Sequence, residues 1–321
     1  MDEGLAACRL IQFASVTVVF GASAFRLYAV RHGDERIFAH LDTRLRGILL
    51  IAAILALLSA LLFVPLIGGR MAGSASAALD WNISSTVLLN TGFGRVWRWH
   101  LLVAALLVVA CALRQVQPVY RLAVAAVLLA SLGLVGHAAI EQGPLGIGHK
   151  TNDAVHLLAG GLWLGGLVPL GMLVLLARRS EHGTYLALLR DVLPRFSRTA
   201  YGAVALVAAT GFVNAVFLVG SIDGLIGTPY GRLLLVKVSL FLLLLAIAVI
   251  NRLILTPSIR GEARAVDRNC RAVVDGWHRA DPRSRHPRGG QRARKPTTRH
   301  PRRWSFRRPA PLIRTRVCTR K

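Results

Sequence analysis

Residues 136–166 contain the side chains of this chain that are best suited to chemistry. The stretch holds three of the ten histidines and two carboxylates: His137, His149, His156, Glu141 and Asp153. Imidazole is a good ligand for copper, zinc, iron and nickel, and it can also carry a proton near neutral pH. The stretch joins two long apolar segments, where ionisable side chains are costly unless function requires them. It therefore indicates a metal-binding or proton-linked site.

The spacing of these residues suggests how they could meet. Asp153 and His156 are three positions apart, so on a helix they would share one face. Thr151 and Asn152 suit a helix N-cap, which places His149 in the preceding loop, where it could fold over the helix end. We expect metal ligation by His137 and His156, with help from His149 and Asp153. The alternative is that each histidine bonds only a carbonyl or water at the membrane interface.

Trp163 lies two helical turns beyond His156 on the same predicted face. It could close the site or simply pack. The neighbouring pairs Gly160-Gly161 and Gly165-Gly166 favour close approach of another helix, as small residues do in membranes.

The apolar residues of the chain are gathered into long runs. The chain has 321 residues, of which 54% are hydrophobic. The runs have about the 20 residues needed to cross a bilayer as a helix. We predict an all-α, polytopic transmembrane bundle of about seven spans, near residues 5–28, 45–68, 97–114, 119–138, 153–177, 198–220 and 231–254.

The distribution of basic residues predicts the orientation of this bundle. Loops 29–44, 114–121 and 178–198 contain ten arginines, whereas the alternate loops contain Arg70, Arg95, Arg98 and Lys150. Lys and Arg accumulate in cytoplasmic loops. The N-terminus is therefore expected outside and the C-terminus inside. All four candidate ligands, and His100, would then lie near the periplasmic face.

Residues 258–321 differ from the rest of the chain, which we expect to form the bundle over residues 1–257. Residues 261–321 carry 19 Lys and Arg against 4 Asp and Glu, and apolar runs are absent. Such a composition predicts disorder. Three interpretations remain: a frameshift product, a cytoplasmic tail that touches anionic lipid, or a nucleic-acid-binding segment. The last has the least support, because no nucleic-acid-binding fold or motif accompanies the charge, so no nucleic-acid partner is expected.

Other motifs give no sign of an enzyme. The segment GPLGIGHKT resembles a phosphate-binding loop, but His149 separates its Gly and Lys and no strand precedes it. The four cysteines are scattered and form no CxxC pair. No nucleophile-and-base set or catalytic carboxylate pair is recognisable.

Four segments in this order resemble one family: VGHAA, DAVHLLAGGLWLGGL, RFSRTA…ATGFVNA and YGRLLLVKVSLFLLLLAIAVINR. They are similar to the copper resistance protein D (CopD) family of bacterial inner-membrane proteins, most specifically over residues 131–257. The resemblance implies a copper ion as cargo, moved from periplasm to cytoplasm. It also implies a possible periplasmic copper-binding partner of the CopC type. Its candidate ligands are His137 and His156, with Trp163 as a motif residue. Family members usually continue into an eighth span, which the basic tail replaces here.

Two other functions remain open at this point. A b-type cytochrome would hold haem between two histidines on facing helices, drawn from His100, His137 and His156. A membrane assembly factor would bind no metal.

Overall fold

The computed structural model describes residues 2–30, 35–134, 143–179, 184–219 and 222–250. Within these ranges the chain is helical, without strands, which confirms the predicted all-α membrane bundle. The helices are α1 (Asp2–Ala29), α2 (Glu35–Met71), the 3₁₀ turn η1 (Ser76–Leu79), α3 (Trp81–Asn90), α4 (Gly92–Ala112), α5 (Pro118–Leu132), α6 (Gly143–Arg179), α7 (Thr184–Val219), α8 (Ile222–Gly227) and α9 (Pro229–Ile250).

Seven of these helices correspond to the seven predicted spans. Six are long and apolar enough to cross a membrane: α1, α2, α4, α6, α7 and α9. The described part of α5 is a shorter apolar helix. The predicted tail, 258–321, lies outside the described residues.

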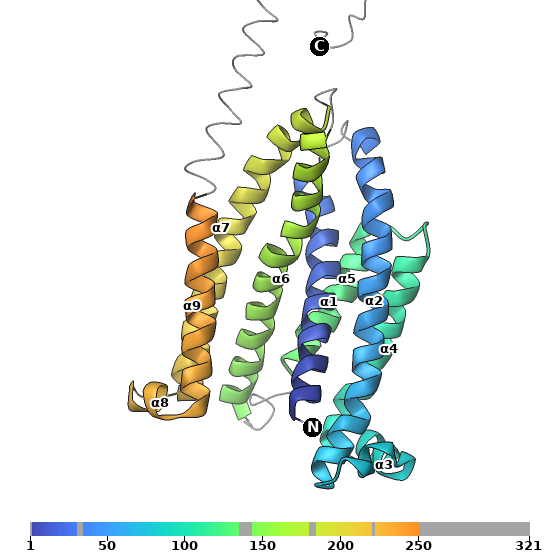
Figure 1. Ribbon diagram of the computed structural model, residues 1–321, viewed down its shortest axis with the longest axis vertical. Coiled ribbons are helices and arrows are strands. Elements are labelled where there is room, and N and C mark those ends of the chain that lie inside the picture. The colour runs from blue at the N-terminus through green and yellow to red at the C-terminus, as the bar shows by residue number, and fades with distance from the viewer. Residues whose placement is uncertain (1, 31–34, 135–142, 180–183, 220–221, 251–321) are drawn as a thin grey trace, which may run out of the picture. The chain divides into compact units, whose positions relative to one another are not determined.

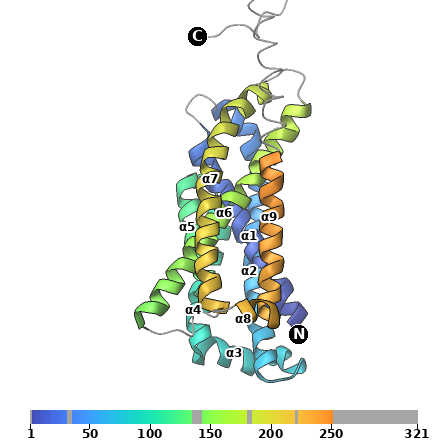
Figure 2. The same ribbon diagram turned by 90° about the vertical axis from the view of Figure 1, so that its left-hand side faces the viewer.

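Residues 1–242 form one compact unit, and the second unit, 243–321, includes the end of α9. Within the first unit the long helices alternate in direction, so α1, α4 and α6 start from the same end (Figures 1 and 2). The N-terminus, α3 and α8 all lie at this end, which we call the N-terminal end. This alternation is the pattern that the loop assignment predicted, and the side of the membrane that this end faces stays a prediction.

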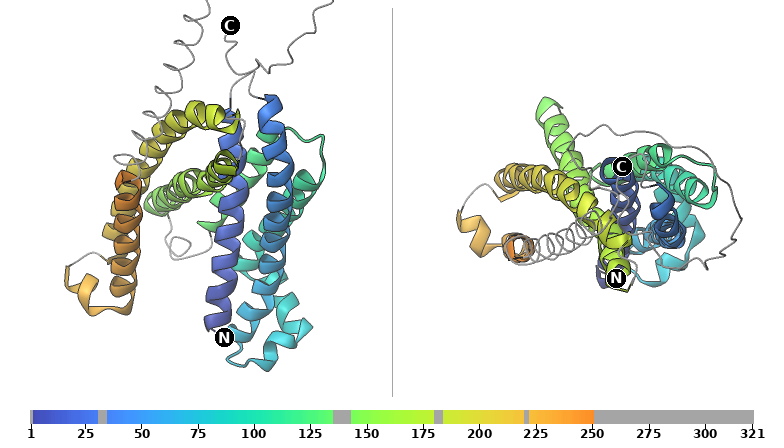
Figure 3. Two further views of the ribbon diagram at one scale, coloured as in Figure 1. Left: turned by 45° about the horizontal axis from the view of Figure 1, so that its top comes forward. Right: turned by 90° about the horizontal axis from the view of Figure 1, so that it is seen from above.

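Helix α1 is the centre of the first unit and contacts α2, α5, α6 and α7 (Figure 3). Two buried clusters lie along it. The first gathers residues of α1, α2, α4 and α5 around Val16, Ala53, Leu107 and Leu128. The second, toward the other end of the bundle, gathers α1, α2, α6 and α7 around Phe25. Trp163 belongs to this second cluster, with its ring edge-on to Phe241 at 5.9 Å. This position supports the packing role considered for Trp163.

The crossing of α1 and α6 is made by glycine. A Cβ atom on Gly21 would collide with the Gly161 carbonyl oxygen and Gly165 Cα, and one on Gly165 would collide with the Thr17 carbonyl oxygen. The two backbones are therefore in direct contact, as the glycine pairs predicted. This contact fixes the longitudinal position of α6 against α1.

Replacing Gly165 by Ala should therefore destabilise the bundle. Overpacking a tight contact typically costs about 1–3 kcal/mol. The measurement is the thermal unfolding of the protein in detergent, compared with wild type.

Gly171→Ala is the matched control on the same helix, since a Cβ there meets nothing within 4 Å. Ala is the better helix former by about 1 kcal/mol, so this variant should be neutral or slightly stabilised. Equal melting temperatures for the two variants would contradict the glycine contact.

Candidate functional site

Six polar side chains face one another across the contact between α6 and α7, near the N-terminal end. Four come from α6 and two from α7: His149, Asn152, Asp153, His156, Thr210 and Asn214. The α6 positions follow the spacing i, i+3, i+4, i+7, which puts them on one helix face. Thr210 and Asn214 are one turn apart on α7. We call these residues the α6–α7 polar cluster.

Helix α6 begins earlier than predicted, and this changes the position of His149. The helix starts at Gly143, with φ of 77°, followed by Pro144, which suits a first helical turn. The Thr151 hydroxyl donates to the Ile147 carbonyl 2.8 Å away and does not cap a helix N-terminus. The prediction that His149 lies in a loop was therefore wrong, and its side chain is buried within the helix contact.

Asn214 joins the two helices by hydrogen bonds to neighbouring α6 side chains. Its Nδ2 donates to Asp153 Oδ1 at 2.6 Å, and its Oδ1 accepts from Asn152 Nδ2 at 2.6 Å. Asn152 Nδ2 also donates to the Thr210 carbonyl at 2.9 Å. The Asn214 amide thus holds Asp153 Oδ1 in place, and Asn152 in turn fixes the orientation of the Asn214 amide.

His156 is oriented by the Thr210 hydroxyl. The two atoms, His156 Nδ1 and Thr210 Oγ1, are 2.9 Å apart, and Thr210 Oγ1 donates its proton to the Leu206 carbonyl at 2.6 Å. Because that proton is committed, the hydroxyl accepts from Nδ1–H. The Nε2 atom of His156 then presents its lone pair. An imidazole fixed through one nitrogen is the usual arrangement of a metal-ligating histidine.

His149 and Asp153 lie one helical turn apart on α6. His149 Nε2 lies 4.0 Å from Asp153 Oδ2, too far for a hydrogen bond. Metal–nitrogen and metal–oxygen bonds of about 2 Å each would join the two atoms at this distance only in a nearly linear arrangement. The His149 ring is 1% exposed and stacks on Phe217 at 5.0 Å, so its orientation is set by packing.

The structure places three of the four predicted ligands, His149, Asp153 and His156, on one face of α6. The fourth, His137, and the nearby Glu141 lie outside the described residues, so their approach to His156 stays a prediction. No group of three His, Cys, Asp or Glu side chains is arranged to hold a metal ion among the residues that the structure describes.

Three members of the cluster were not predicted as part of the site. Asn152 was considered only as a helix cap, Asn214 is a polar residue in an apolar segment to which no role was given, and Thr210 was not considered at all. The sequence contains a feature that could have indicated them. Thr210 is one turn from Asn214 on an otherwise apolar helix, where a pair of polar residues is costly unless it has partners.

His100, considered above as a haem ligand, lies in a different set of helices. Its Nε2 is 2.7 Å from Gln12 Nε2 of α1, and its Nδ1 is 2.7 Å from Ser131 Oγ of α5. It therefore does not contribute to the α6–α7 polar cluster.

Comparison with known proteins gives two family matches. Residues 1–147 match the family model described as "Copper resistance protein D-like, N-terminal domain", and residues 190–276 match "Copper resistance protein D". Thr210 and Asn214 fall in the second range, whereas His149, Asp153 and His156 lie between the two ranges. No solved structure matches the chain.

Three curated proteins are similar to most of the chain. "Inner membrane protein YebZ" of Escherichia coli (strain K12) is 34% identical over 79% of this chain and 85% of its own length. "Copper resistance protein D" of Pseudomonas syringae pv. tomato is 30% identical over 84% of this chain and 86% of its own length. "Copper transport protein CutJ" of Bacillus subtilis (strain 168) is 28% identical over 79% of this chain and 47% of its own length.

Replacing Asn214 by Ala should destabilise the α6–α7 contact by about 1–2 kcal/mol, because it removes partners of Asp153 and Asn152 at membrane depth. Unfolding in detergent or bicelles measures the loss. Val216→Ala is the control, as Val216 is 56% exposed on the same helix and should change stability by less than about 0.5 kcal/mol. A larger loss for Val216→Ala than for Asn214→Ala would contradict the role of these hydrogen bonds.

Proposed function

The chain belongs to the copper resistance protein D family, and from this premise we propose that it handles copper at the α6–α7 polar cluster. Family membership and its membrane-capable helices make it a multi-pass protein of the inner membrane. Two of its relatives are named for copper resistance and copper transport. Copper is its cargo in this proposal, and no catalytic step is assigned to the chain.

The observation that carries the proposal is the orientation of His156. The Thr210 hydroxyl accepts from Nδ1, so Nε2 is left to bind a metal ion. Imidazole nitrogen binds both Cu(I) and Cu(II) well. Asp153 supplies a carboxylate one turn away, and its charge would offset that of the ion. His149 lies 4.0 Å from that carboxylate and would complete the site, with His137 arriving from the segment before α6.

We propose that copper enters from the periplasm and passes to the cytoplasm. The N-terminal end of the bundle would face the periplasm, because the arginine-rich loops belong to the other end. A copper ion would then meet the α6–α7 polar cluster soon after entry. A periplasmic copper-binding protein of the CopC type would be a suitable donor.

The geometry favours copper over haem. His100 uses both ring nitrogens in hydrogen bonds with α1 and α5, whereas His156 bonds α7. Axial ligation by His100 Nε2 would break its contact with Gln12, and no described contact brings His100 and His156 to opposite sides of one site.

Copper accumulation in cells tests the proposal. Cells expressing the wild-type chain should accumulate copper above the empty-vector level, and His156→Ala should reduce that excess about tenfold through loss of a ligand. His40→Ala is the control, since this exposed histidine on α2 lies in the opposite half of the bundle. Membrane protein levels are compared by immunoblot. Wild-type accumulation in the His156→Ala variant would contradict the site assignment, and lower copper in wild type than in vector would contradict import.

Reporter fusions test the orientation. Alkaline phosphatase folds only outside the cytoplasm, so a fusion after Gly227, between α8 and α9, should be active. A fusion after Leu113, between α4 and α5, should be inactive. The reverse pattern would place the α6–α7 polar cluster at the cytoplasmic face.

A further inference from the structure

Helix α9 carries a lysine inside an apolar sequence. Lys237 lies eight positions after Pro229, the first residue of the helix, which is about 12 Å along it. The helix contains no acidic residue, and the described residues form no ion pair with Lys237. A charged side chain within a membrane-spanning helix is costly and usually serves the function of the protein. The charge of Lys237 therefore needs an explanation.

The spacing of residues on α9 places Lys237 on the side that contacts α6. Leu234, Lys237 and Phe241 follow the spacing i, i+3, i+7 and share one side of the helix. Leu234 and Phe241 are partly buried, whereas most of the helix is exposed. The Phe241 ring meets Trp163 of α6 at 5.9 Å. Lys237 itself is exposed, so it borders this contact and its ammonium is not packed into it.

Lys237 lies at about the level of His156. Helix α6 and the first part of α9 both start from the N-terminal end of the bundle (Figure 2). From the contact between Trp163 and Phe241, His156 lies seven positions back along α6, and Lys237 lies four positions back along α9. At 1.5 Å per residue, these steps are about 10 Å and about 6 Å. Side chains on a helix lean toward its N-terminus, so the long lysine side chain covers the remaining difference.

Two opposite charges therefore act on the copper site that is proposed above. The carboxylate of Asp153 and the ammonium of Lys237 both interact electrostatically with the His156 ring. Without copper these two charges balance each other. A copper ion is attracted by Asp153 and repelled by Lys237, so the occupied site carries at least one uncompensated positive charge.

We propose that Lys237 sets the strength of copper binding at the α6–α7 polar cluster and promotes release of the ion. This inference rests on the proposed function, because it needs copper to bind at His156. A transport site must bind its ion strongly enough to admit it and weakly enough to let it leave. Asp153 and His156 provide the attraction, and Lys237 limits it by repulsion. An ammonium has no lone pair, so Lys237 acts on the ion through its charge and is not a ligand.

The affinity of the purified protein for copper tests this proposal. The full chain is reconstituted in lipid nanodiscs, and Cu(I) is titrated against a competing chelator under reducing conditions. The site of interest is defined as the copper binding that is lost in His156→Ala. Mixing the loaded protein with excess chelator then gives the dissociation rate from that site.

Lys237→Met removes the charge and keeps a long apolar side chain that suits the membrane. It should bind copper about tenfold more tightly at the His156-dependent site, because a like charge on the order of 10 Å away, at an effective dielectric constant of about 20, corresponds to a factor of that size. The dissociation rate should fall by a similar factor. Lys237→Arg keeps the charge and should stay within about twofold of wild type. A purely structural role for Lys237 predicts weaker binding in Lys237→Met, which is the opposite direction.

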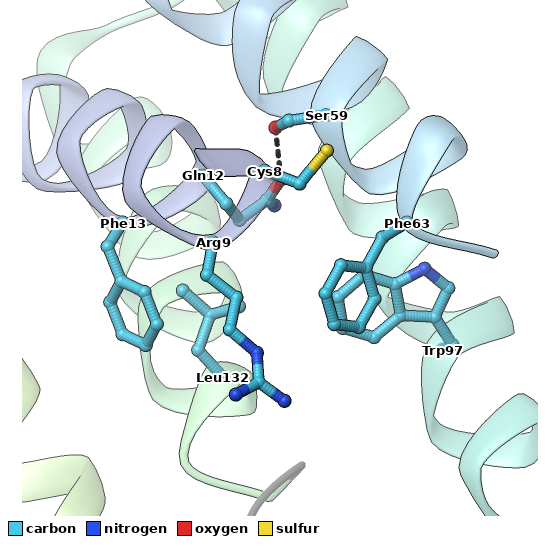
Figure 4. Close-up of a pocket in the computed structure, with 8 residues that line it drawn as sticks. All are labelled: Cys8, Arg9, Gln12, Phe13, Ser59, Phe63, Trp97 and Leu132. Atoms are coloured by element: carbon cyan, nitrogen blue, oxygen red, sulfur yellow. Dashed lines mark hydrogen bonds between the residues drawn. The ribbon is translucent and has the colours of Figure 1, made fainter. Parts of the chain in front are cut away.

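Arg9 of α1 provides a matched control for the loss of one positive charge. It lines a small cavity whose lining residues come from α1, α2, α4 and α5 (Figure 4). Its guanidinium lies over the Phe63 ring of α2, 5.5 Å from the ring centroid. Arg9→Gln should therefore leave the affinity of the His156-dependent site within about twofold of wild type, and a melting curve checks that each variant is folded.

The outcomes separate the two proposals. Equal copper binding by wild type and His156→Ala would contradict the proposed copper site, and with it the role of Lys237. A His156-dependent site with the same affinity and dissociation rate in wild type and Lys237→Met would overturn the role of Lys237 alone, and would assign its ammonium to the lipid headgroups. Equal tightening by Arg9→Gln and Lys237→Met would also overturn that role, because the effect would then come from the overall charge of the protein.

Discussion

The hydrogen bonds of Asn214 to Asp153 and Asn152 are the interaction on which the α6–α7 polar cluster depends. The Asp153 carboxylate is only 26% exposed on a largely apolar helix, where a charged group is costly unless protein groups bind it. Asn214 does so with one nitrogen, and Asn152 keeps the Asn214 amide in the required orientation. The same face of α6 then carries His149 and His156 at fixed positions. Without the bonds to α7, these residues would be isolated polar groups in an apolar environment.

The second constraint is the backbone contact between α1 and α6. Gly21 and Gly165 leave no space for a Cβ atom, so α6 cannot slide along α1 without a collision. This contact fixes the position of the α6–α7 polar cluster along α1, which also carries Gln12, the hydrogen-bond partner of His100.

Most of the fold followed from the sequence, because the bilayer restricts what an apolar run of about 20 residues can do. The seven long apolar helices of the described residues, six of them long enough to cross a membrane, and their alternating direction were predicted from such runs. The start of α6 was not, because Thr151 and Asn152 looked like a helix cap, whereas Pro144 had already begun the helix. His149 was therefore expected in a loop and is instead buried against Phe217.

The arrangement of the α6–α7 polar cluster could be predicted only in part. The spacing of Asp153 and His156 in the sequence is enough to place them on one helix face. Their partners Thr210 and Asn214 come from a helix more than 50 positions away, and only the packing of α6 on α7 brings them together. The Gln12–His100 contact joins residues 88 positions apart and has no local sign in the sequence.

The most direct measurement of the central claim is anomalous scattering at the copper edge from crystals of the copper-loaded protein. We expect a peak about 2 Å from His156 Nε2, within reach of the Asp153 carboxylate. Copper bound to the protein without a peak at this contact between α6 and α7 would contradict the account.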